Sequence, residues 1–369
     1  MIRPAVVEDV PALVAVEDRC FASDRFSRRQ FRHLLTRANA VTLVDDEGGA
    51  IRGYVNVLFH AGTSLARLYS CAVLPERQGR GLGRALLNAA EEAARDRGSA
   101  WMRLEVRPDN ESAISLYHAF GYRRFDVIND YYDDHADALR MEKRLVPAKA
   151  PSAAPVPYYR QTLDFTCGPA CLLMAMKAHD PEMKADRSLE IQLWRESTTV
   201  FMTSGLGGCG ALGLALAALR RGFEIEVSVS NETEIFVNSV RSEEKKEVIR
   251  LVEQQFVREL AQAGVLIRRR PLTAKDIKER LKRDGIPVAL ISSYRLTGEK
   301  VPHWIKITSF DDRFIYINDP FVDPEEDRTE TDCIGIPIVP QELDRMMRLG
   351  RRKHFASLIV YPKRKDATL

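Results

Sequence analysis

A proline-rich segment near the middle of the chain restricts what this sequence can fold into more than any other feature does. Residues 146–157, VPAKAPSAAPVP, hold four prolines with small residues between them. Proline fixes its φ angle and lacks a backbone N–H, so neither a helix nor a sheet can take up such a stretch. We therefore expect a semi-rigid linker over 146–157 that joins two separately folded domains, residues 1–145 and 158–369. A chain of 369 residues is long enough for each domain to bury its own core.

Composition and charge exclude several classes of protein. The 55 lysines and arginines nearly balance the 52 aspartates and glutamates, so no global field points to nucleic acid or to an acidic membrane as a partner. The longest nearly uncharged apolar run, residues 205–219, is shorter than the roughly 20 residues of a membrane helix, and we expect a core helix there. Six cysteines without a CxxC pair are too sparse for a disulfide scaffold. We therefore expect a cytoplasmic, soluble protein with reduced thiols, while the sequence does not indicate its oligomeric state.

Residues 1–145 alternate between strand and helix patterns. Short apolar runs rich in β-branched residues predict strands, and apolar positions spaced three and four apart predict helices between them. The sequence DDEGG, residues 45–49, has the chemistry of a hairpin turn between two of these strands. The order is that of a mixed α/β sheet with helices inserted among its strands. The expected strands are 2–5, 41–45, 51–59, 65–73, 101–106, 122–127 and 138–145, and the expected helices are 8–20, 27–38, 81–97 and 111–120.

A glycine-rich turn, LPERQGRGLGRALL, joins the strand over 65–73 to the helix that follows. Glycine allows successive backbone N–H groups to turn toward one point, and the helix N-terminus adds a partial positive charge, which together suit a pyrophosphate. The arginines of the turn could add to this charge. The alternative is that the glycines serve only the tight connection from strand to helix. The residues that lead into the helix are Gln78, Gly79, Gly81 and Gly83.

The pattern Gln78-x-x-Gly81-x-Gly83, followed downstream by LEVRPDNESAISLYHAFGY, resembles the GNAT acetyltransferases, and within them the ribosomal-protein alanine N-acetyltransferases. The resemblance covers residues 1–145 and implies the GNAT fold, with acetyl-coenzyme A (acetyl-CoA) as the acetyl donor. It also implies a peptide or protein amine as the acceptor. The residues that it assigns to acetyl-CoA are Cys71, Ala72 and Val73 of a splayed strand, Gln78, Gly79, Gly81, Gly83 and Arg84 of the turn, and Asn110.

Acetyl transfer to an amine asks for two proton transfers, because the ammonium must lose a proton before it attacks and the donor's thiolate gains one as it leaves. The resemblance assigns Glu105 as the base and Tyr117 as the acid. In the strand MRLEV, Glu105 shares a face with Arg103 and Arg107. One alternative is therefore that Glu105 is a solvated residue between two arginines, and another is that Tyr117 only packs its helix.

A cysteine at the start of a buried helix is the main feature of residues 158–369. In the sequence FTCGPACLLMAM, Pro169 suits the first turn of a helix, and the uncharged residues after it suit a helix without a solvent face. Cys167 then lies at the helix N-terminus, where the macrodipole favours the nucleophilic thiolate. The alternative is a structural cysteine, since free cysteine is among the most buried residue types.

A second segment, VPHWIKITSFDDRFIYINDPF, alternates as two strands joined by a turn at Asp311 and Asp312. His303 begins the first strand, and Asp319 follows the second. A hairpin brings these two ends together, so that Asp319 can orient the imidazole while His303 takes the thiol proton. The alternatives are a surface histidine and an aspartate that only begins the NDP turn.

These two segments resemble the papain-like peptidases that remove double-glycine leader peptides from bacteriocin precursors. The resemblance implies a papain-like α+β domain and assigns Cys167, His303 and Asp319 as its catalytic set. It also assigns Gln161, six positions before the cysteine, to the oxyanion hole. We expect Cys171, one turn after Cys167, to pack in the core, with a role as a resolving thiol as the alternative. No compact group of cysteine and histidine indicates a metal site.

Two features depart from that family. Thr166 stands where the family commonly has aspartate, and residues 231–270 have the pattern of an insertion that contains an amphipathic helix. We expect this helix to present one apolar stripe, formed by Val248, Leu251, Val252, Phe256 and Leu260.

The sequence thus predicts a two-domain α/β (α+β) protein, in which a mixed sheet flanked by helices precedes a papain-like domain. The main hypothesis is a bifunctional enzyme that joins an acetyl-CoA-dependent N-acetyltransferase to a thiol peptidase or amidase. Its substrates would be peptides or proteins, and we expect no metal, nucleic acid or membrane to take part. The alternative is an acetyltransferase whose second domain is an inactive peptide-binding module.

Overall fold

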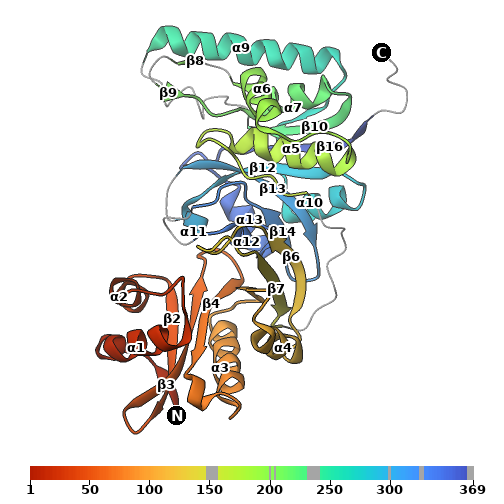
Figure 1. Ribbon diagram of the computed structural model, residues 1–369. Coiled ribbons are helices and arrows are strands. Elements are labelled where there is room, and N and C mark those ends of the chain that lie inside the picture. Colours follow the sequence, from red (N-terminus) through yellow and green to blue (C-terminus); the bar gives the residue numbers. More distant parts are fainter. Residues whose placement is uncertain are drawn as a thin grey trace. The chain divides into compact units, whose positions relative to one another are not determined.

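The computed structural model describes residues 1–146, 157–198, 201–202, 205–230, 242–297, 301–323 and 328–363. The chain divides into two compact units, Met1–Pro147 and Ala148–Leu369, which we call the N-terminal and C-terminal units (Figure 1). Apart from its two end residues, the expected linker lies outside the described residues.

The N-terminal unit is built on a seven-stranded sheet in the order β1-β2-β3-β4-β5-β7-β6, in which only β4 and β5 are parallel neighbours. Its strands are β1 (Ile2–Pro4), β2 (Ala40–Glu47), β3 (Ala50–Phe59), β4 (Leu65–Val73), β5 (Trp101–Val106), β6 (Arg123–Ile128) and β7 (Ala138–Arg144). Its helices are α1 (Val10–Cys20), α2 (Arg28–Thr36), α3 (Leu82–Asp96) and α4 (Glu111–Ala119), with short 3-10 turns η1 (Val7–Asp9) and η2 (Pro75–Arg77). Every element expected from the sequence is present, with bounds that differ by at most two residues.

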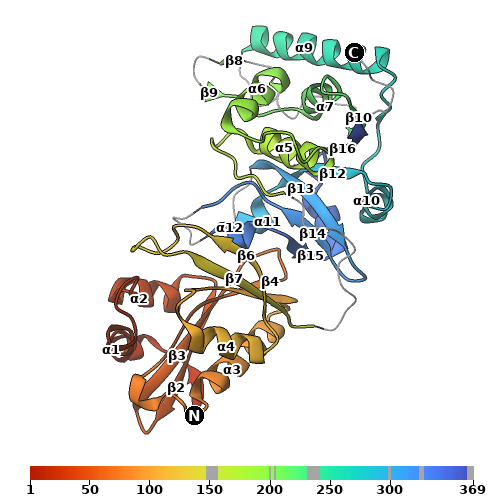
Figure 2. The same ribbon diagram turned by 45° about the vertical axis from the view of Figure 1, so that its right-hand side comes forward.

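Helices cover both faces of this sheet (Figures 1 and 2). α1 and α2 lie on one face, where Leu13, Phe31 and Tyr54 belong to one core cluster. α3 and α4 lie on the other face, where Leu86 and Val55 belong to a second cluster. Strand β3 contributes to both clusters because successive side chains point to opposite faces. A sheet covered on both faces explains why its strands read as nearly continuous apolar runs.

The C-terminal unit has its own seven-stranded sheet, in the order β11-β10-β16-β12-β13-β14-β15. Its strands are β10 (Phe223–Val229), β11 (Ile267–Arg268), β12 (Ile286–Ser292), β13 (Pro302–Phe310), β14 (Ile315–Asn318), β15 (Ile336–Ile338) and β16 (Ala356–Lys363), and β8 (Phe201–Met202) pairs with β9 (Gly205–Leu206) separately. Its helices are α5 (Cys167–His179), α6 (Arg187–Ser197), α7 (Ala211–Leu219), α9 (Glu243–Gln262), α10 (Ala274–Leu281), α11 (Tyr294–Thr297), α12 (Glu330–Cys333) and α13 (Pro340–Met346). The expected two-domain α/β fold class is confirmed.

Strand β12 shows how the C-terminal unit is layered. Its residues Val288 and Leu290 point to one face, into the core cluster that contains much of α5 and α7. Ala289 and Ile291 point to the opposite face, into a cluster with Ile277 of α10. The sheet therefore separates two apolar cores. Helix α5, which begins with Cys167, packs on β13, which contains His303.

The uncharged run over 205–219, expected as one core helix, forms such a helix, α7, in its second part, whereas its first two residues form strand β9. Within the run, α7 is buried from Ala211 through Ala218. Among the described residues, no helix is both long and apolar enough to span a membrane.

The apolar stripe expected for the inserted helix is partly wrong. Phe256 and Leu260 of α9 are buried in the core shared with α7, but Val248 and Leu251 are 48% and 54% exposed. The buried side includes Ile249 instead, which is 1% exposed. The first half of α9 carries apolar residues on more than one side, so periodicity alone does not select the side that packs.

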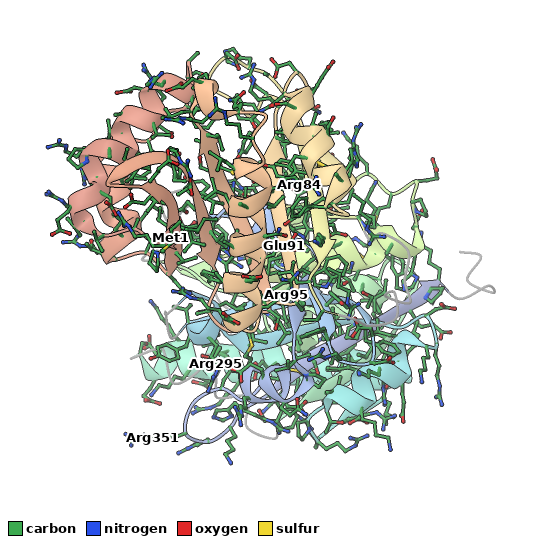
Figure 3. The ribbon with its side chains drawn as sticks, turned by 90° about the horizontal axis from the view of Figure 1, so that it is seen from below. Met1, Arg84, Glu91, Arg95, Arg295 and Arg351 are labelled. Atoms are coloured by element: carbon green, nitrogen blue, oxygen red, sulfur yellow. The ribbon has the colours of Figure 1, made fainter. Side chains whose placement is uncertain are left out.

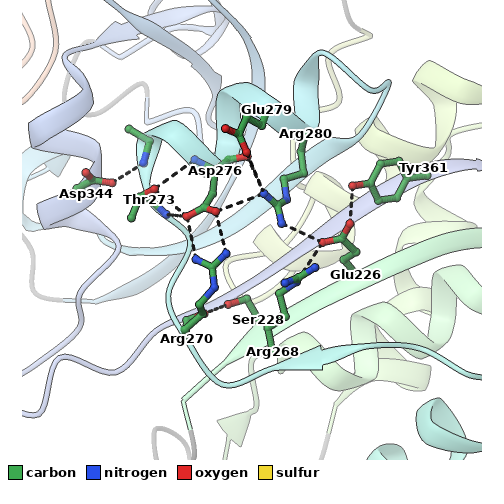
Figure 4. Close-up of polar contacts among 11 residues, drawn as sticks. Glu226, Ser228, Arg268, Arg270, Thr273, Asp276, Glu279, Arg280, Asp344 and Tyr361 are labelled. Atoms are coloured by element: carbon green, nitrogen blue, oxygen red, sulfur yellow. Dashed lines mark hydrogen bonds and ion pairs between the residues drawn. The ribbon is translucent and has the colours of Figure 1, made fainter.

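The residues after α9 rejoin the sheet. β11 pairs with β10 in parallel, and Glu226 of β10 lies 3.4 Å from Arg268 of β11 and from Arg280 of α10 (Figure 4). Tyr361 of β16 donates a 2.8 Å hydrogen bond to the same carboxylate. Residues 242–270, expected as part of an insertion, therefore carry an edge strand that is integrated into the sheet.

Candidate active sites

Strands β4 and β5 separate in the region that the sequence assigns to the acetyl donor. The two strands pair only over Leu65–Arg67 and Trp101–Arg103. Beyond that point β4 continues along β3, whereas β5 continues along β7. Within the described strands, residues 70–73 therefore have a ladder on their β3 side alone, which leaves backbone groups on the other side for a ligand. This segment contains Cys71, Ala72 and Val73.

The turn after β4 has a backbone conformation that favours glycine. Gly79 and Gly81 have φ angles of 72° and 79°, in the left-handed region where other residues are strained. Gly81 is the N-cap of α3, so the unpaired N–H groups of the first helical turn lie next to it. Gly83 has an ordinary φ, and a Cβ there would lie 3.4 Å from Leu116 of α4. The first two glycines serve the turn, and the third serves helix packing.

Two side chains hold this turn in place. Gln78 donates from Nε2 to the carbonyl oxygen of Val73 at 3.2 Å, which ties the turn to the end of β4. Arg84 lies in the first turn of α3, at the other end of the helix from Arg95, and its guanidinium lies 5.1 Å from the ring centre of Phe120 (Figure 3). A helix N-terminus preceded by left-handed glycines fits an anionic group such as a pyrophosphate.

Asn110 is the N-cap of α4. Its Oδ1 accepts hydrogen bonds from the backbone N–H of Ala113 and the hydroxyl of Ser112, both at 3.2 Å. The side-chain oxygen thus stabilises the start of α4. The exposed amide nitrogen is the part of Asn110 that could serve the cofactor's arm.

Glu105 is not the solvated residue that one alternative expected. Its side chain is 5% exposed, and its Oε2 lies 2.9 Å from Nε of Arg67, a buried arginine of β4. Arg67 also donates to the hydroxyl of Tyr131 at 2.9 Å. The arginines on either side of Glu105 pair with other carboxylates instead. The other oxygen of Glu105, Oε1, is buried and accepts no hydrogen bond from the described residues.

Tyr117 points from α4 into the core and is 7% exposed. Burial raises the pKa of its phenol above the ordinary value, and nearby Cys71 raises it further. Burial also raises the pKa of Cys71 to about 12. Both groups keep their protons at neutral pH, so Tyr117 has a proton to donate, and Cys71 is not a nucleophile.

The second site begins at the first residue of α5. Cys167 is 9% exposed, and the helix after it is buried through Met176, which explains its uncharged sequence. A Cβ at Gly168 would lie 3.0 Å from Leu214 of α7 and 3.1 Å from Trp304 of β13. The start of α5 therefore packs tightly, and this packing fixes the cysteine at the helix N-terminus.

Strands β13 and β14 form the expected hairpin, with Lys306 opposite Asn318. The hairpin brings His303 to Asp319, with 2.6 Å between Nε2 of the ring and Oδ1 of the carboxylate. The side chain of Cys167 also acts on the imidazole and raises the pKa of His303. Because Nε2 is engaged by the carboxylate, Nδ1 is the ring nitrogen left for the thiol. The thiol, the imidazole and the carboxylate therefore lie near one another.

The electrostatics of this set favour a charged histidine. Burial lowers the pKa of His303, but the charge of Asp319 and the hydrogen bonds to Asp319 and Cys167 outweigh it and raise the pKa to about 10. Burial alone would raise the pKa of Asp319, yet Arg328 and His303 hold it below its ordinary range. At neutral pH the site holds an imidazolium beside a carboxylate, and such a cation can stabilise a thiolate.

Gln161 lies on the segment that precedes α5. Its backbone N–H donates to the carbonyl of Pro320 at 3.0 Å, and its Nε2 donates to Leu163 at 2.9 Å. Glu190 of α6 anchors the same segment, since its carboxylate accepts from the backbone N–H and the hydroxyl of Thr162 at 2.9 and 2.6 Å. The amide of Gln161 carries a second hydrogen, which could serve an oxyanion.

Thr166, which stands where the resembled family commonly has aspartate, is fully buried. Its hydroxyl donates to the carbonyl of Leu163 at 2.8 Å. Thr166 therefore stabilises the turn before α5.

Three buried charged residues that hold a site residue or its segment in place were not found from the sequence: Arg67, Glu190 and Arg328. Arg67 interrupts the apolar strand LARLYSCAV, and that interruption is a signal for a buried, paired charge. Glu190 and Arg328 stand in ordinary polar surroundings of the sequence. Nothing local marks Arg328, whose Nη2 lies 2.6 Å from Oδ2 of Asp319.

The other cysteines of this unit serve packing. Cys171 and Cys209 are 0% and 1% exposed, and burial raises the pKa of each well above its ordinary value. The described ranges contain no group of three or more histidine, cysteine, aspartate or glutamate side chains that could hold a metal ion.

The N-terminal unit has the GNAT fold, and the C-terminal unit places a cysteine, a histidine and an aspartate near one another. Residues 156–361, more than half of the chain, match the Peptidase_C39 like family, and the chain belongs to this family. Residues 10–122 match the Acetyltransferase (GNAT) family, so the N-terminal unit is a GNAT acetyltransferase domain. Both resemblances expected from the sequence are confirmed.

Known proteins similar to this chain include N-acetyltransferases. The ribosomal protein bS18-alanine N-acetyltransferase of Salmonella typhimurium is 32% identical over 136 residues, which cover 36% of this chain and 89% of that protein. The N-terminal acetyltransferase A complex catalytic subunit NAA10 of Arabidopsis thaliana is 31% identical over 148 residues, or 39% of this chain and 77% of that protein. The crystal structure of the ribosomal-protein-S18-alanine N-acetyltransferase from Escherichia coli has 28% identity and a TM-score of 0.37, and the match covers 40% of this chain and 96% of that one.

Proposed function

We propose that the N-terminal unit transfers the acetyl group of acetyl-CoA to the α-amine of a peptide or protein, and that the C-terminal unit is a thiol peptidase or amidase. The observation that carries the proposal is the 2.6 Å hydrogen bond of the His303–Asp319 pair, whose imidazole is also acted on by Cys167 at the N-terminus of α5. The splayed strand β4, the left-handed glycine turn and the GNAT family match support the first activity.

In the N-terminal unit, residues 71–73 and the turn from Gln78 to Arg84 would hold acetyl-CoA, which supplies the acetyl group as a thioester. Glu105 accepts the proton of the acceptor ammonium at Oε1, the oxygen that Arg67 does not contact. Arg67 orients the carboxylate through its hydrogen bond to Oε2. Tyr117 keeps its proton until it donates it to the leaving thiolate.

In the C-terminal unit, the imidazolium of His303 carries at Nδ1 the proton that came from the thiol of Cys167, and the thiolate Sγ attacks the carbonyl carbon of an amide. The resulting oxyanion accepts hydrogen bonds from Nε2 of Gln161 and from the backbone at the start of α5. His303 then gives its proton to the amine as the C–N bond breaks, which leaves a thioester on Cys167. A water molecule deprotonated by His303 hydrolyses the thioester, and the thiol is restored.

A protein amine is the favoured acceptor because the related acetyltransferases are named for a ribosomal-protein alanine and for N-terminal acetylation. The fusion of the two units further suggests one shared substrate. Cleavage by the C-terminal unit would release the α-amine that the N-terminal unit acetylates.

One experiment tests both activities. The purified full chain is incubated with a cell lysate and acetyl-CoA, and new N-termini and new acetyl groups are mapped by mass spectrometry. Cys167→Ala should abolish the new N-termini and keep acetylation of amines that already exist. Tyr117→Phe should lower acetylation by about 10²-fold with little change in acetyl-CoA affinity. Acetylation by Tyr117→Phe at the wild-type rate would remove the acid role.

Labelling by iodoacetamide separates a thiol hydrolase from an inactive peptide-binding module. If the thiol site is active, iodoacetamide should alkylate Cys167 faster than the buried Cys171, and His303→Ala should strongly slow the alkylation of Cys167. No labelling of Cys167, or labelling that His303→Ala leaves unchanged, would favour the binding module.

A further inference from the structure

The carboxylate of Asp319 is shared between two cations. Its Oδ1 accepts from Nε2 of His303 at 2.6 Å and from the backbone N–H of Phe321 at 2.9 Å. Its Oδ2 accepts from Nη2 of Arg328, also at 2.6 Å. The side chains of Asp319 and Arg328 are 1% and 8% exposed, so water does not screen their attraction. Removing Asp319 would leave Arg328 as an uncompensated buried charge, and removing Arg328 would leave Asp319 with His303 as its one cationic partner among the described residues.

The backbone holds Arg328 in place independently of this ion pair. Arg328 and Asp323 form an isolated β-bridge with backbone hydrogen bonds of 2.8 and 3.0 Å. The next residue, Thr329, caps α12, and its backbone N–H donates to Asp332 at 2.9 Å. The guanidinium is therefore delivered to Asp319 from a position fixed on both sides.

We propose that Arg328 is a positioning residue of the thiol site, which keeps Asp319 ionised and aimed at His303 and so stabilises the thiolate of Cys167. This inference rests on the proposed thiol hydrolase function. When Cys167 is ionised, the four side chains carry alternating charges, from thiolate through imidazolium and carboxylate to guanidinium. Without the guanidinium, the other three have a net negative charge in a buried setting, and proton uptake by the thiolate or the carboxylate becomes more favourable.

The other titratable groups around these four side chains do not replace the guanidinium. These groups are cysteine thiols, a tyrosine phenol and carboxyl groups, which are neutral when protonated and negative when ionised, so none of them can balance the negative charge of Asp319. Within the described residues, Arg328 is thus the cation that shares Asp319 with His303. The groups coupled to Asp319, Arg328 or His303 are Cys167 and Cys171 of α5, Tyr158, and Asp332 and Cys333 of α12. Glu330 acts on Tyr158 and Cys333, and Lys306 of β13 acts on Cys171, one turn from Cys167.

The test measures the rate constant for alkylation of Cys167 by iodoacetamide as a function of pH, in the full chain, with the modified peptide quantified by mass spectrometry. No substrate needs to be known. Arg328→Gln keeps hydrogen-bond donors and removes the charge, whereas Arg328→Lys keeps the charge with a different geometry. Arg328→Met is a second uncharged variant, for use if Arg328→Gln does not give the wild-type circular dichroism spectrum.

The rate constant for alkylation falls toward low pH, and in Arg328→Gln we expect the midpoint of this fall to lie about one pH unit higher than in the wild type. The reason is that loss of a nearby positive charge raises the pKa of a thiol. On the acid side of that midpoint, alkylation should slow by about tenfold. Arg328→Lys should return the midpoint close to that of the wild type. A merely structural role would lower rates in all variants without moving the midpoint.

An unchanged midpoint in folded Arg328→Gln or Arg328→Met overturns the inference, as does a midpoint in Arg328→Lys equal to that of Arg328→Gln. Failure of the proposed function gives a different result. In that case the wild type and His303→Ala are alkylated alike at Cys167, whatever residue stands at position 328.

Discussion

Replacing Lys306 with methionine is expected to stabilise the C-terminal unit. Lys306 lies in β13, opposite Val288 of β12 and Asn318 of β14, and is 0% exposed. Its Nζ has no hydrogen-bond partner among the described residues. Burial lowers its pKa from 10.5 to about 7, against an opposing effect of Cys171. A buried ammonium without a partner is destabilising, and methionine has a similar volume without the charge.

The magnitude follows from this pKa. The unfolded state binds more protons than the folded state between pH 7 and pH 10.5, because the folded pKa is the lower one. The cost of the buried ammonium is therefore absent above pH 10.5, grows as the pH falls and is complete below pH 7. At about 1.4 kcal/mol for each pKa unit, Lys306→Met should raise the free energy of unfolding by on the order of 5 kcal/mol at pH ~6 and by about 2 kcal/mol at pH ~9.

Urea unfolding of the full chain, followed by tryptophan fluorescence at both pH values, measures this difference. In a Trp101→Phe background, the two remaining tryptophans, Trp194 and Trp304, both report on the C-terminal unit. The matched control is Lys275→Met, at an exposed position of α10, which should change stability by less than about 0.5 kcal/mol. If Lys306→Met raises the free energy of unfolding equally at both pH values, or does not raise it, the argument from an uncompensated buried charge is refuted.

Three further predictions concern the two sites. Gly81→Ala should destabilise the N-terminal unit by about 1–2 kcal/mol and weaken acetyl-CoA binding in calorimetry, because Gly81 has a φ of 79°. Gly98→Ala, also at a φ of 79° but beyond the other end of α3, is its control and should lower stability similarly without weakening acetyl-CoA binding. Glu105→Gln, which can still accept the hydrogen bond of its arginine partner, should lower kcat for acetylation by about 10²-fold, and a kcat close to that of the wild type would exclude the base role. Glu190→Gln should lower peptidase kcat/KM by about tenfold, because Glu190 anchors the segment that holds Gln161, the proposed donor to the oxyanion. An equal loss in the alkylation rate of Cys167 would show that the change acts on the thiol and not on the oxyanion.

The N-terminal fold could be predicted almost completely from the sequence. The elements there alternate in short, strongly patterned segments, and turns such as the hairpin at residues 45–49 have local chemistry of their own. The separation of β4 from β5 after Arg67 could not be derived from the pattern of either strand. It depends on which neighbour each strand pairs with, and strand pairing is a property of the whole sheet.

The thiol site was partly predictable for the same reason. Cys167 and His303 stand at element starts that their own segments define, and the hairpin that joins His303 to Asp319 is local in sequence. The side of α9 that packs was not predictable, because Val248, Ile249 and Leu251 offer more than one apolar side.

The sequence by itself indicated the order of the elements in residues 1–145, a division at the proline segment and a candidate nucleophile with its histidine and aspartate. These depend on periodicity, backbone chemistry and short separations along the chain. Only the tertiary structure decided which buried charges meet: Arg67 with Glu105, Arg328 with Asp319, and Lys306 with none of the described side chains. The physical reason is that a charge in a buried segment can be compensated from any element that folding brings near, and the sequence around that charge carries no record of the partner.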